Sequence, residues 1–418
     1  MEGQLRSLKI DYKTLKSDLC EIGRVYDTDK SAWRDNRTLY RHCHPYTLFY
    51  NGLFKNKRNE KLKIAEIGIL KGSSLLMWNL YFGNSIIYGL EHCIDFIREF
   101  MILNPYTERI KLDYINVKSE ESITETFERI KEEFDLIIED TTHLLEDQLR
   151  VIETVYKYLK PGGMLIIEDI LKSESEDKYI EVIKKLGDIY QDYYFVELDH
   201  VNKWSPNANN DKLLILIKSG AENIFKNNDN KITIITPSYR VDNLKLIEKS
   251  LNYDYIDEWI IIYDGNKIAE PVKQFNNEKI SEYYYENKEK GSYGNTLRNY
   301  GLEQVKNKDT LIYYLDDDNM IYNDLYRLLD IVEKNRIYTF DQRNNLNGDN
   351  NYILRGKEIE YQKIDSAMVL MDYKICKDIK WNKELYCADY LHIRECYERN
   401  MDKHIYINNI LCNYNTIE

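Results

Sequence analysis

The sequence predicts an α/β protein with two domains. Short apolar segments typical of strands alternate with helical segments, and this alternation starts twice along the chain. A polar stretch at residues 220–230 separates the two series and is typical of a linker. At 418 residues the chain is also longer than most single compact domains. We therefore predict one domain over residues 1–219, including a helical N-terminal extension, and a second domain over residues 231–418.

The expected strands are short apolar runs, several of which are followed by an acidic residue. In sheets built from alternating strands and helices the strands are mostly parallel, and ligands bind beyond their carboxyl ends. A polar residue just after such a run is therefore a candidate for binding or catalysis. The first series comprises residues 63–68, 85–90, 134–139, 163–168 and 213–218, and the second comprises residues 231–236, 258–263 and 310–315.

Composition argues against one class of function, general nucleic-acid binding. The hydrophobic fraction of 43% and the charged fraction of 31% are typical of a soluble globular protein. The formal charge of −13 argues against general nucleic-acid binding, because neutralising phosphates requires a surplus of Lys and Arg. It is compatible with a protein that recruits divalent cations locally.

The cysteines indicate neither a zinc site nor a disulfide framework. The seven cysteines are scattered, form no CxxC pair and are odd in number. We expect a reducing compartment. The N-terminus lacks the apolar core of a signal peptide, and no apolar run reaches the roughly 18 residues of a membrane span, so we expect a cytoplasmic protein.

The first predicted strand leads into a glycine-containing turn, in the sequence AEIGILKGSS at residues 65–74. Gly68 and Gly72 would let the backbone turn tightly and approach a ligand, and the helix that follows offers free N–H groups. A purely structural turn is an equal alternative. The next strand ends at Glu91, where nucleotide-binding sheets commonly hold a ribose diol. Together these features favour a cofactor that contains adenosine.

Two later strands of the first series end in acids, in the sequences DLIIEDTTH at residues 135–143 and PGGMLIIEDI at residues 161–170. If the strands are parallel neighbours, Asp140, Glu168 and Asp169 meet at one edge of the sheet. Clustered carboxylates must be protonated or share a cation, and ligation by oxygen alone suits Mg²⁺. His143 is close enough in sequence to act as a general base. For any single acid, a helix N-cap is the structural alternative.

These residues resemble the class I S-adenosylmethionine-dependent methyltransferases, which have a Rossmann-like sheet. The similarity is greatest to the metal-dependent sugar O-methyltransferases related to macrocin and rhamnosyl O-methyltransferases and to the cephalosporin hydroxylase group. Their motifs match TDK at residues 28–30, HPYT at 44–47 with Tyr50, EDTTH at 139–143 and the PGG…EDI element at 161–170, all within about residues 20–218.

The resemblance implies a role for each matched residue. Glu66, Gly68, Gly72 and Glu91 would bind S-adenosylmethionine. Asp140, Glu168 and Asp169 would hold Mg²⁺ beneath two sugar hydroxyls, and His143 would take the proton. Two positions depart from the family pattern, with Thr141-Thr142 in place of Gly-Ser and Asn116-Val-Lys118 in place of a GDQS-like turn.

The second series carries its own acidic strand ends. Residues 231–243 form a strand with a Pro-Ser turn, the next strand ends at Asp264, and a glycine-punctuated loop at residues 290–299 leads into a helix. Three aspartates, residues 316–318, then follow an apolar run. An Asp-x-Asp strand end is a recurrent way to hold a divalent ion against a diphosphate. A solvated acidic turn is the alternative.

This series resembles the family 2 glycosyltransferases of GT-A fold, over about residues 231–415. The resemblance implies that Pro237, Tyr239 and Asp264 line a pocket for the base and ribose of a nucleotide sugar, with Arg298 and Asn299 on the same side. Asp316 and Asp318 would form the DxD motif and hold Mn²⁺ or Mg²⁺, with Asp318 as the direct ligand. Asp316 would also contact the nucleotide sugar. Asp389 would be the base that deprotonates the acceptor in an inverting transfer; an N-capping aspartate is the alternative.

The sequence thus predicts a bifunctional transferase of glycan biosynthesis, which transfers a sugar from a nucleotide-sugar donor and methylates a sugar hydroxyl. Its expected partners are the nucleotide sugar and a glycan or glycoconjugate acceptor, without nucleic acid, and a homo-oligomer stays open. Two alternatives remain. One domain is a degenerate binding module, or the chain methylates small metabolites and its second domain presents carbohydrate.

Overall fold

The computed structural model describes residues 6–34, 42–105, 107–204, 209–227, 229–268, 273–286, 294–344, 352–385 and 387–414. The chain divides into two compact units. The N-terminal unit comprises Lys16–Lys226 with Leu5–Lys9, and the C-terminal unit comprises Asn227–Glu418 with Ile10–Leu15. The division falls inside the predicted linker, of which Asn228 lies outside the described residues.

The N-terminal unit is built on a mostly parallel sheet with the strand order β7-β8-β6-β5-β2-β3-β4. The strands from β6 to β4 are parallel, and β7 and β8 add antiparallel pairs. Their bounds are β2 Lys63–Ile67, β3 Ile86–Glu91, β4 Ile110–Tyr114, β5 Phe134–Glu139, β6 Leu159–Ile167, β7 Tyr190–Asp199 and β8 Lys212–Lys218. All five strands predicted from the first series are present.

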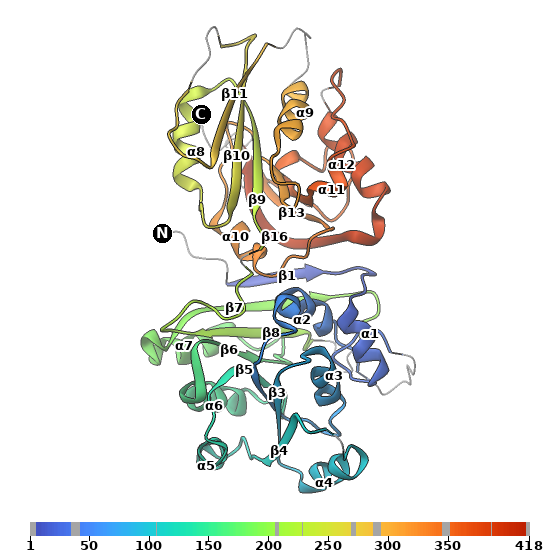
Figure 1. The fold of residues 1–418 in the computed structure, drawn as a ribbon, viewed down its shortest axis with the longest axis vertical. Coiled ribbons are helices and arrows are strands. Elements are labelled where there is room, and N and C mark those ends of the chain that lie inside the picture. Colours follow the sequence, from blue (N-terminus) through green and yellow to red (C-terminus); the bar gives the residue numbers. More distant parts are fainter. Residues whose placement is uncertain are drawn as a thin grey trace. The chain divides into compact units, whose positions relative to one another are not determined.

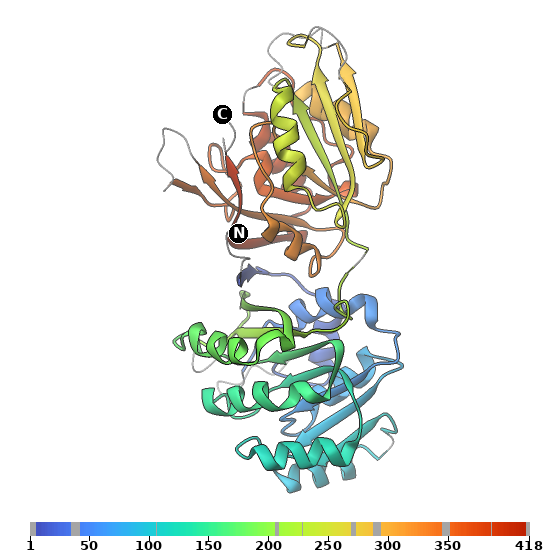
Figure 2. The ribbon, with the colours of Figure 1, turned by 90° about the vertical axis from the view of Figure 1, so that its left-hand side faces the viewer.

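Helices cover both faces of this sheet (Figures 1 and 2). Helices α5 to α7 lie on one face and α1 to α4 on the other, which explains why the central strand β5 is buried along its whole length. The bounds are α1 Asp18–Val25, α2 Tyr46–Phe54, α3 Ser73–Tyr81, α4 Ile94–Leu103, α5 Glu120–Ile130, α6 Leu145–Val155 and α7 Glu176–Lys185.

Two strands of this sheet were not predicted. β4 is an edge strand whose residues are mostly half-buried or exposed, so it lacks the continuous apolar run that identified its neighbours. β7 is rich in tyrosine and acidic residues, and its burial varies from residue to residue. Prediction from apolar runs therefore found the strands that are covered on both faces and missed those with a solvent-facing side.

The C-terminal unit has a mixed sheet with the strand order β11-β10-β9-β12-β15-β13-β16, and β14 pairs with β13. The first four strands are parallel, whereas β15 runs antiparallel to both β12 and β13. Ile10 of β1 (Ser7–Asp11) pairs with Ile407 of β16. The bounds are β9 Ile232–Ser238, β10 Ile256–Asp264, β11 Ile280–Tyr285, β12 Leu311–Tyr314, β13 Ile337–Asn344, β14 Tyr352–Leu354, β15 Val369–Asp372 and β16 His404–Tyr414.

Helices also lie on both sides of the parallel strands of the C-terminal unit, with α8 on one face and α9 on the other (Figures 1 and 2). The three strands predicted from the second series correspond to β9, β10 and β12. The predicted α/β class is thereby confirmed, while the assignment of this unit to the GT-A fold stays a prediction. The bounds are α8 Leu244–Ser250, α9 Asn295–Gln304, α10 Asn323–Leu329, α11 Tyr373–Cys376 and α12 Ala388–Glu398.

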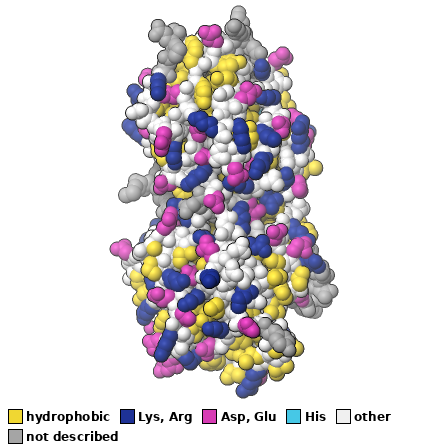
Figure 3. Space-filling model, in the orientation of Figure 1, with side chains coloured by type: hydrophobic (Ala, Val, Ile, Leu, Met, Phe, Trp, Pro, Cys, Tyr) yellow, Lys and Arg dark blue, Asp and Glu magenta, His cyan; other side chains and the backbone are white. Residues whose placement is uncertain are grey.

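The surface and the helices add two observations. Basic and acidic side chains are intermixed over the face seen in Figure 3, without a large area of one sign. None of the helices in the described ranges combines the length and the apolar character that crossing a bilayer requires.

One buried histidine makes the C-terminal unit sensitive to acid. His404 is 2% exposed, and its ring lies between the Lys13 ammonium, 2.7 Å from Nδ1, and the Thr339 hydroxyl, 2.8 Å from Nε2. The ammonium can only donate, so Nδ1 accepts its hydrogen bond and Nε2–H donates to the Thr339 hydroxyl. The imidazole of His404 is therefore neutral. Burial and the charge of Lys13 lower the pKa of His404 to about 3.

We expect this histidine to destabilise the C-terminal unit as pH falls. The unfolded chain takes up the proton near pH 6.5 and the folded chain only near pH 3, so stability is fully present above pH 6.5 and is lost between those values. The loss is up to about 1.4 kcal/mol per pH unit for this one group. Denaturant unfolding of the wild type and of His404→Gln at pH 7 and pH 4.5 measures the free energy of unfolding that is lost with acid. The stability difference between the two should narrow with acid, and a constant difference would contradict the expectation.

Candidate active site

Three neighbouring parallel strands of the N-terminal unit end at the edge of the sheet where the predicted acids lie. β2 pairs with β5, and β5 pairs with β6. The ladder continues one residue past the strands, because the Asp140 N–H donates to the Ile67 carbonyl (2.8 Å) and the Glu168 N–H donates to the Glu139 carbonyl (2.9 Å). The structure therefore brings Asp140, Glu168 and Asp169 together at one edge.

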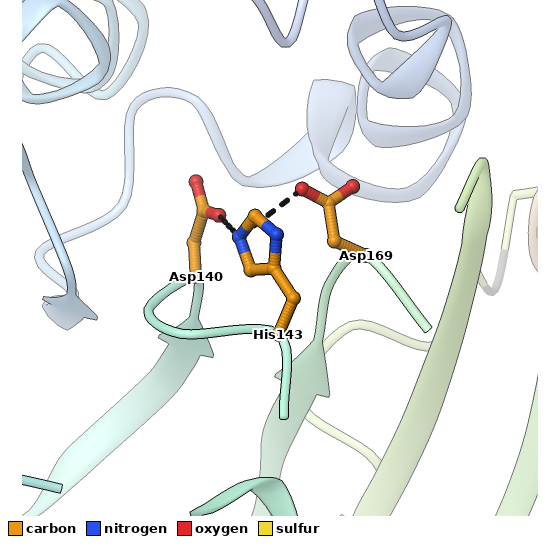
Figure 4. A group of neighbouring side chains, drawn as sticks. All are labelled: Asp140, His143 and Asp169. Carbon is orange, nitrogen blue, oxygen red and sulfur yellow. Dashed lines mark hydrogen bonds and ion pairs between the residues drawn. The ribbon is translucent and has the colours of Figure 1, made fainter. Parts of the chain in front are cut away.

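His143 lies between two of these carboxylates (Figure 4). Its Nε2 is 3.2 Å from Asp140 Oδ1 and 3.3 Å from Asp169 Oδ2. One potential ligand atom from each of the three residues lies within 4.8 Å of the other two, which is compact enough for a metal ion. Among the described residues, this is the group that has such an arrangement.

The turns that carry this group are strained. His143 has a φ of 57° and Asp169 a φ of 56°, the left-handed region that residues with a Cβ rarely adopt. Each such residue costs on the order of 1 kcal/mol or more, and strain of this kind concentrates at functional sites. The fold tolerates it where it aims the imidazole and the carboxylate at one point.

The three side chains also change one another's pKa. Burial alone would lower the pKa of His143, but the hydrogen bond to Asp140 and the charge of Asp169 raise it to about 9. Burial would raise the pKa of Asp140, yet the charges of Lys30 and His143 hold it well below its usual range. In this state His143 is therefore a cation shared by two carboxylates.

A second layer of side chains from the N-terminal segment holds the acids in place. The Tyr46 hydroxyl donates to Asp169 Oδ1 and the Tyr50 hydroxyl donates to Glu168 Oε1, each at 2.5 Å. The Lys30 ammonium, which is 1% exposed, contacts the carboxylates of both Asp140 and Glu168. The sequence analysis matched the TDK and HPYT motifs that supply this layer but assigned no role to Lys30.

The site carries more buried carboxylates than cations. Burial raises the pKa of four carboxyl groups at this edge, which are Glu66, Glu139, Glu168 and Asp169. Carboxylates that are held close together away from water either take up protons or bind a cation. The donor set of this edge therefore fits a divalent ion such as Mg²⁺.

A cavity of about 770 Å³ opens above this edge. Asp140, His143 and Asp169 form one part of its lining, and Gly68 and Glu91 form another. Its apolar lining consists of Ile69, Leu70, Leu90, Phe96, Ile115 and Val117. The volume is typical of pockets for small molecules and cofactors. Of the other predicted residues, Glu66, Gly72 and Glu168 do not line it.

Glu91 holds the loop between β2 and α3. Its Oε2 accepts hydrogen bonds from the N–H groups of Ile69 (3.1 Å) and Leu70 (3.0 Å), and its Oε1 accepts from Cys93 (2.9 Å). His92 Nδ1 also lies 2.8 Å from Oε1, so these four contacts engage the acceptor positions of the carboxylate. The predicted contact with a ribose stays a prediction.

The backbone conformation and close packing of this loop require glycine at positions 68 and 72. Gly68 has a φ of +87°, and a Cβ there would lie 2.0 Å from the Asp140 carbonyl oxygen. Gly72 has a φ of +79°, and a Cβ there would lie 2.2 Å from the ring of Phe100. The tight turn that the sequence left as an alternative is therefore present. Gly68 also sets how closely the cavity loop approaches Asp140.

In the C-terminal unit the middle aspartate of the triplet has a structural role. Asp317 Oδ2 accepts hydrogen bonds from the Ser238 hydroxyl (3.1 Å) and from the N–H groups of Tyr239 (2.8 Å) and Arg240 (2.7 Å). These bonds fix the turn after β9 against the end of β12. Arg240 also pairs with Asp317 Oδ1 (2.6 Å) and Asp318 Oδ2 (2.9 Å), which offsets the repulsion between adjacent carboxylates.

Two further predicted acids, Asp316 and Asp389, interact with Arg298. Its guanidinium pairs with Asp316 Oδ1 at 2.5 Å. Burial raises the pKa of Asp389 to about 7, a rise that Arg298 opposes and Asp365 reinforces. Burial also raises the pKa of Asp365 to about 6, together with the charge of Asp316. Asp365 is not among the predicted site residues, so its interaction with the other acids is new.

The contacts of the remaining predicted residues of this unit do not by themselves indicate a binding site. Asn299 exchanges two hydrogen bonds with the backbone of Trp381 (3.0 and 2.8 Å), which is a packing role. The Tyr239 ring is 42% exposed and has the Lys267 ammonium 3.6 Å from its centroid. Asp264 accepts from the N–H of Asn266, and Pro237 lies inside β9. Residues 290–293 of the predicted glycine loop lie outside the described residues.

Comparison with known proteins does not assign a family. No family model matches the chain, and no curated protein matches it.

Three solved structures are weakly similar to part of the chain. The MycE methyltransferase of the mycinamycin biosynthetic pathway, in complex with Mg and SAH, is 20% identical with a TM-score of 0.35 and covers 49% of this chain and 56% of its own. The fibrillarin pre-rRNA processing protein of Methanococcus jannaschii is 18% identical, with a TM-score of 0.30 and coverages of 39% and 69%. CrArsM, an arsenic(III) S-adenosylmethionine methyltransferase of Chlamydomonas reinhardtii, is 13% identical, with a TM-score of 0.29 and coverages of 40% and 68%. The chain thus spans just over half the length of MycE, and similarities this weak carry no argument about function.

Proposed function

We propose that the N-terminal unit is a metal-dependent methyltransferase that moves a methyl group from S-adenosylmethionine to a sugar hydroxyl. The observation that carries this proposal is the group of Asp140, His143 and Asp169 in the lining of a cavity of about 770 Å³. The group combines oxygen ligands with an imidazole at the carboxyl ends of parallel strands, where such sheets bind their ligands.

Asp140 and Asp169 would supply carboxylate oxygens to Mg²⁺ at this edge. A bound Mg²⁺ lowers the pKa of a coordinated hydroxyl, which otherwise is a poor nucleophile. Tyr46 orients Asp169 through its 2.5 Å hydrogen bond, so the carboxylate faces the cavity without rotating. His143 can accept the hydroxyl proton once its two carboxylate partners are engaged elsewhere, because those partners are what raise its pKa.

The cofactor would occupy the part of the cavity beside the β2–α3 loop. There the apolar side chains of Phe96, Ile115 and Val117 offer contacts for a flat adenine ring, and Glu91 keeps the loop closed over the strand ends. The N-terminus of α3 adds free N–H groups at the same loop. This arrangement would place the methyl donor next to Asp140.

Calorimetric titration with S-adenosylmethionine and S-adenosylhomocysteine tests the cofactor, and a panel of glycosides with vicinal hydroxyls and labelled cofactor tests the reaction. We expect binding of both cofactors, and transfer that requires Mg²⁺ and is abolished by a chelator. Absence of cofactor binding would refute the proposal. Transfer that persists in the chelator would refute its metal-dependent part.

We propose a second function, glycosyl transfer, for the C-terminal unit. The observation that favours it is the convergence of Asp316, Asp365 and Asp389 on Arg298, two of them with a raised pKa. An aspartate with a pKa near 7 suits a general base for an acceptor hydroxyl. Together the two functions would make a bifunctional enzyme, in which one product is released close to the next site.

Ligand-induced stabilisation tests the nucleotide-sugar donor. A ligand that binds only the folded state raises the melting temperature in proportion to the logarithm of its concentration over Kd. We expect one nucleotide sugar of a panel to raise the melting temperature in Mn²⁺. If none does so, the C-terminal unit is better explained as a binding module.

Replacing the proposed base should separate catalysis from donor binding. We expect Asp389→Asn to reduce glycosyl transfer by about 10²–10⁴-fold, the usual contribution of general base catalysis, while the donor-induced shift in melting temperature persists. The matched control is Asp378→Asn, which changes an aspartate that is 78% exposed beside Lys377. Equal activities of the two variants would contradict the assignment.

A further inference from the structure

Trp204 is an exposed tryptophan of the N-terminal unit that neither proposed reaction uses. It lies between β7 and β8 and is 40% exposed. By contrast, Trp78, Trp259 and Trp381 are at most 1% exposed. Tryptophan has a large apolar side chain that is mostly buried in proteins, so an exposed indole is a candidate for contact with a ligand.

The backbone holds this indole in a defined place. Trp204 forms an isolated antiparallel β-bridge with Cys43, in which each N–H donates to the carbonyl of the other residue, at 2.7 and 2.8 Å. Cys43 is 2% exposed, so the bridge joins Trp204 to a buried part of the segment that leads into α2. The indole is therefore exposed although its backbone is fixed, and a preformed surface of this kind binds a ligand at a low entropic cost.

A row of aromatic rings connects Trp204 with the proposed metal site. The His42 ring lies edge-on to Trp204, with 6.0 Å between the ring centroids, and 5.9 Å from the His44 ring. His44 Nδ1 is in turn 3.8 Å from Asp169 Oδ1. His42 lines the cavity, so Trp204 stands next to the lining. Each of these steps is comparable to the width of a pyranose ring, which places Trp204 within one or two sugar rings of the metal site.

The wall of the cavity on this side is polar. Asp29, Arg34 and His42 line it, and Asp29 is exposed. The Arg34 guanidinium donates to the His42 carbonyl (2.8 Å) and to Asp27 Oδ1 (2.9 Å), which fixes the wall. Polar side chains beside an exposed aromatic face suit a sugar, because its hydroxyls form hydrogen bonds with the polar groups and the apolar C–H face of its ring packs on the indole.

We propose that Trp204 is an aromatic platform on which a second sugar ring of the acceptor stacks. The acceptor of the methyl group is then a glycan in which the methylated sugar is joined to another sugar. This inference rests on the proposed methyltransferase and defines its substrate class more closely. Contacts with the second ring, remote from the reacting hydroxyl, help to hold that hydroxyl at the metal site.

Calorimetric titration of the full chain, saturated with S-adenosylhomocysteine and Mg²⁺, tests this inference without reference to activity. The probes are three pairs of sugars: glucose and maltose, galactose and lactose, and mannose and mannobiose. We expect at least one disaccharide to bind at least 10-fold more tightly than its monosaccharide. Trp204→Ala should remove this advantage and leave the monosaccharide affinity within 2-fold. Trp204→Phe keeps an aromatic face and should retain the disaccharide affinity within 3-fold.

The matched control is Tyr114→Ala at the end of the edge strand β4. Tyr114 is also 40% exposed, and it does not line the cavity. This variant should bind the disaccharide as the unsubstituted protein does. Octyl glucoside distinguishes a second sugar ring from an apolar aglycone. If it bound more tightly than every disaccharide and lost this affinity in Trp204→Ala, the platform would serve an aglycone and the inference would be overturned.

Two further outcomes overturn the inference and leave the proposed function standing, provided that S-adenosylhomocysteine binds. One is the absence of an advantage for any of the three disaccharides, and the other is an advantage that persists in Trp204→Ala. If the unsubstituted protein does not bind S-adenosylhomocysteine, the proposed function fails and the inference fails with it. The cofactor titration therefore separates the two kinds of failure.

Discussion

Replacing Asp169 with asparagine should lower kcat/KM for methyl transfer by at least about 10³-fold. The carboxylate is one of the proposed oxygen ligands of Mg²⁺. A metal ion that polarises a hydroxyl lowers the activation barrier by several kcal/mol. At 1.36 kcal/mol for each factor of ten, about 4 kcal/mol corresponds to this loss. Asparagine keeps the shape of the side chain and the oxygen that accepts from the Tyr46 hydroxyl, so the fold should tolerate the change. The measurement is the rate of transfer from labelled S-adenosylmethionine at saturating Mg²⁺.

The matched control for Asp169→Asn is Asp95→Asn on α4. Asp95 has an 86% exposed side chain and pairs with the exposed Arg98 on its own helix. Exposed pairs of this kind contribute at most about 1 kcal/mol, so its activity should match the wild type. If Asp169→Asn retained a tenth of the wild-type activity, Asp169 would not be a ligand whose charge the reaction needs.

The strand ends of the N-terminal unit were predictable because strands buried on both faces have continuous apolar sequences. β5 and β6 end as apolar runs that stop abruptly at acids, and a parallel sheet puts such stops at one edge. That reasoning brought Asp140, Glu168 and Asp169 together without any coordinates. It could not say which oxygens face the cavity and which face the protein.

The sequence could not predict which side chains each of these acids contacts. Lys30 reaches Asp140 and Glu168 across separations of 110 and 138 residues, so no local pattern encodes the contact. The same holds for the triplet at residues 316–318, where the Asp-x-Asp pattern argued for a metal. Asp316 and Asp318 instead meet Arg298 and Arg240, and Asp317 fixes a turn, so the structure satisfies these charges with arginines. Whether a metal joins them stays a prediction.

Replacing Gly68 with alanine should destabilise the N-terminal unit by about 3 kcal/mol and impair the proposed site as well. The residue has a φ of +87°, which costs an L-residue about 1–2 kcal/mol, and its new methyl group would lie 2.0 Å from the Asp140 carbonyl oxygen. Because the obstacle is backbone and not a flexible side chain, the strand ends must separate, at a further cost of about 1–3 kcal/mol. The shift displaces Asp140 from His143, and we expect the affinity for Mn²⁺ to fall together with stability.

Gly83→Ala is the matched control, because no heavy atom lies within 4 Å of a Cβ built there. Such a substitution should change stability by less than about 1 kcal/mol, since it mainly reduces the freedom of the unfolded chain. For a unit of this size, about 3 kcal/mol corresponds to a fall in melting temperature of about 6–12 °C for Gly68→Ala, and calorimetry resolves it. If Gly68→Ala melted like Gly83→Ala and bound Mn²⁺ normally, the loop would not be held against Asp140 at this distance. The cofactor alone would then explain the glycine at position 68. The proposal that the position of the cavity loop determines the position of Asp140 would be wrong.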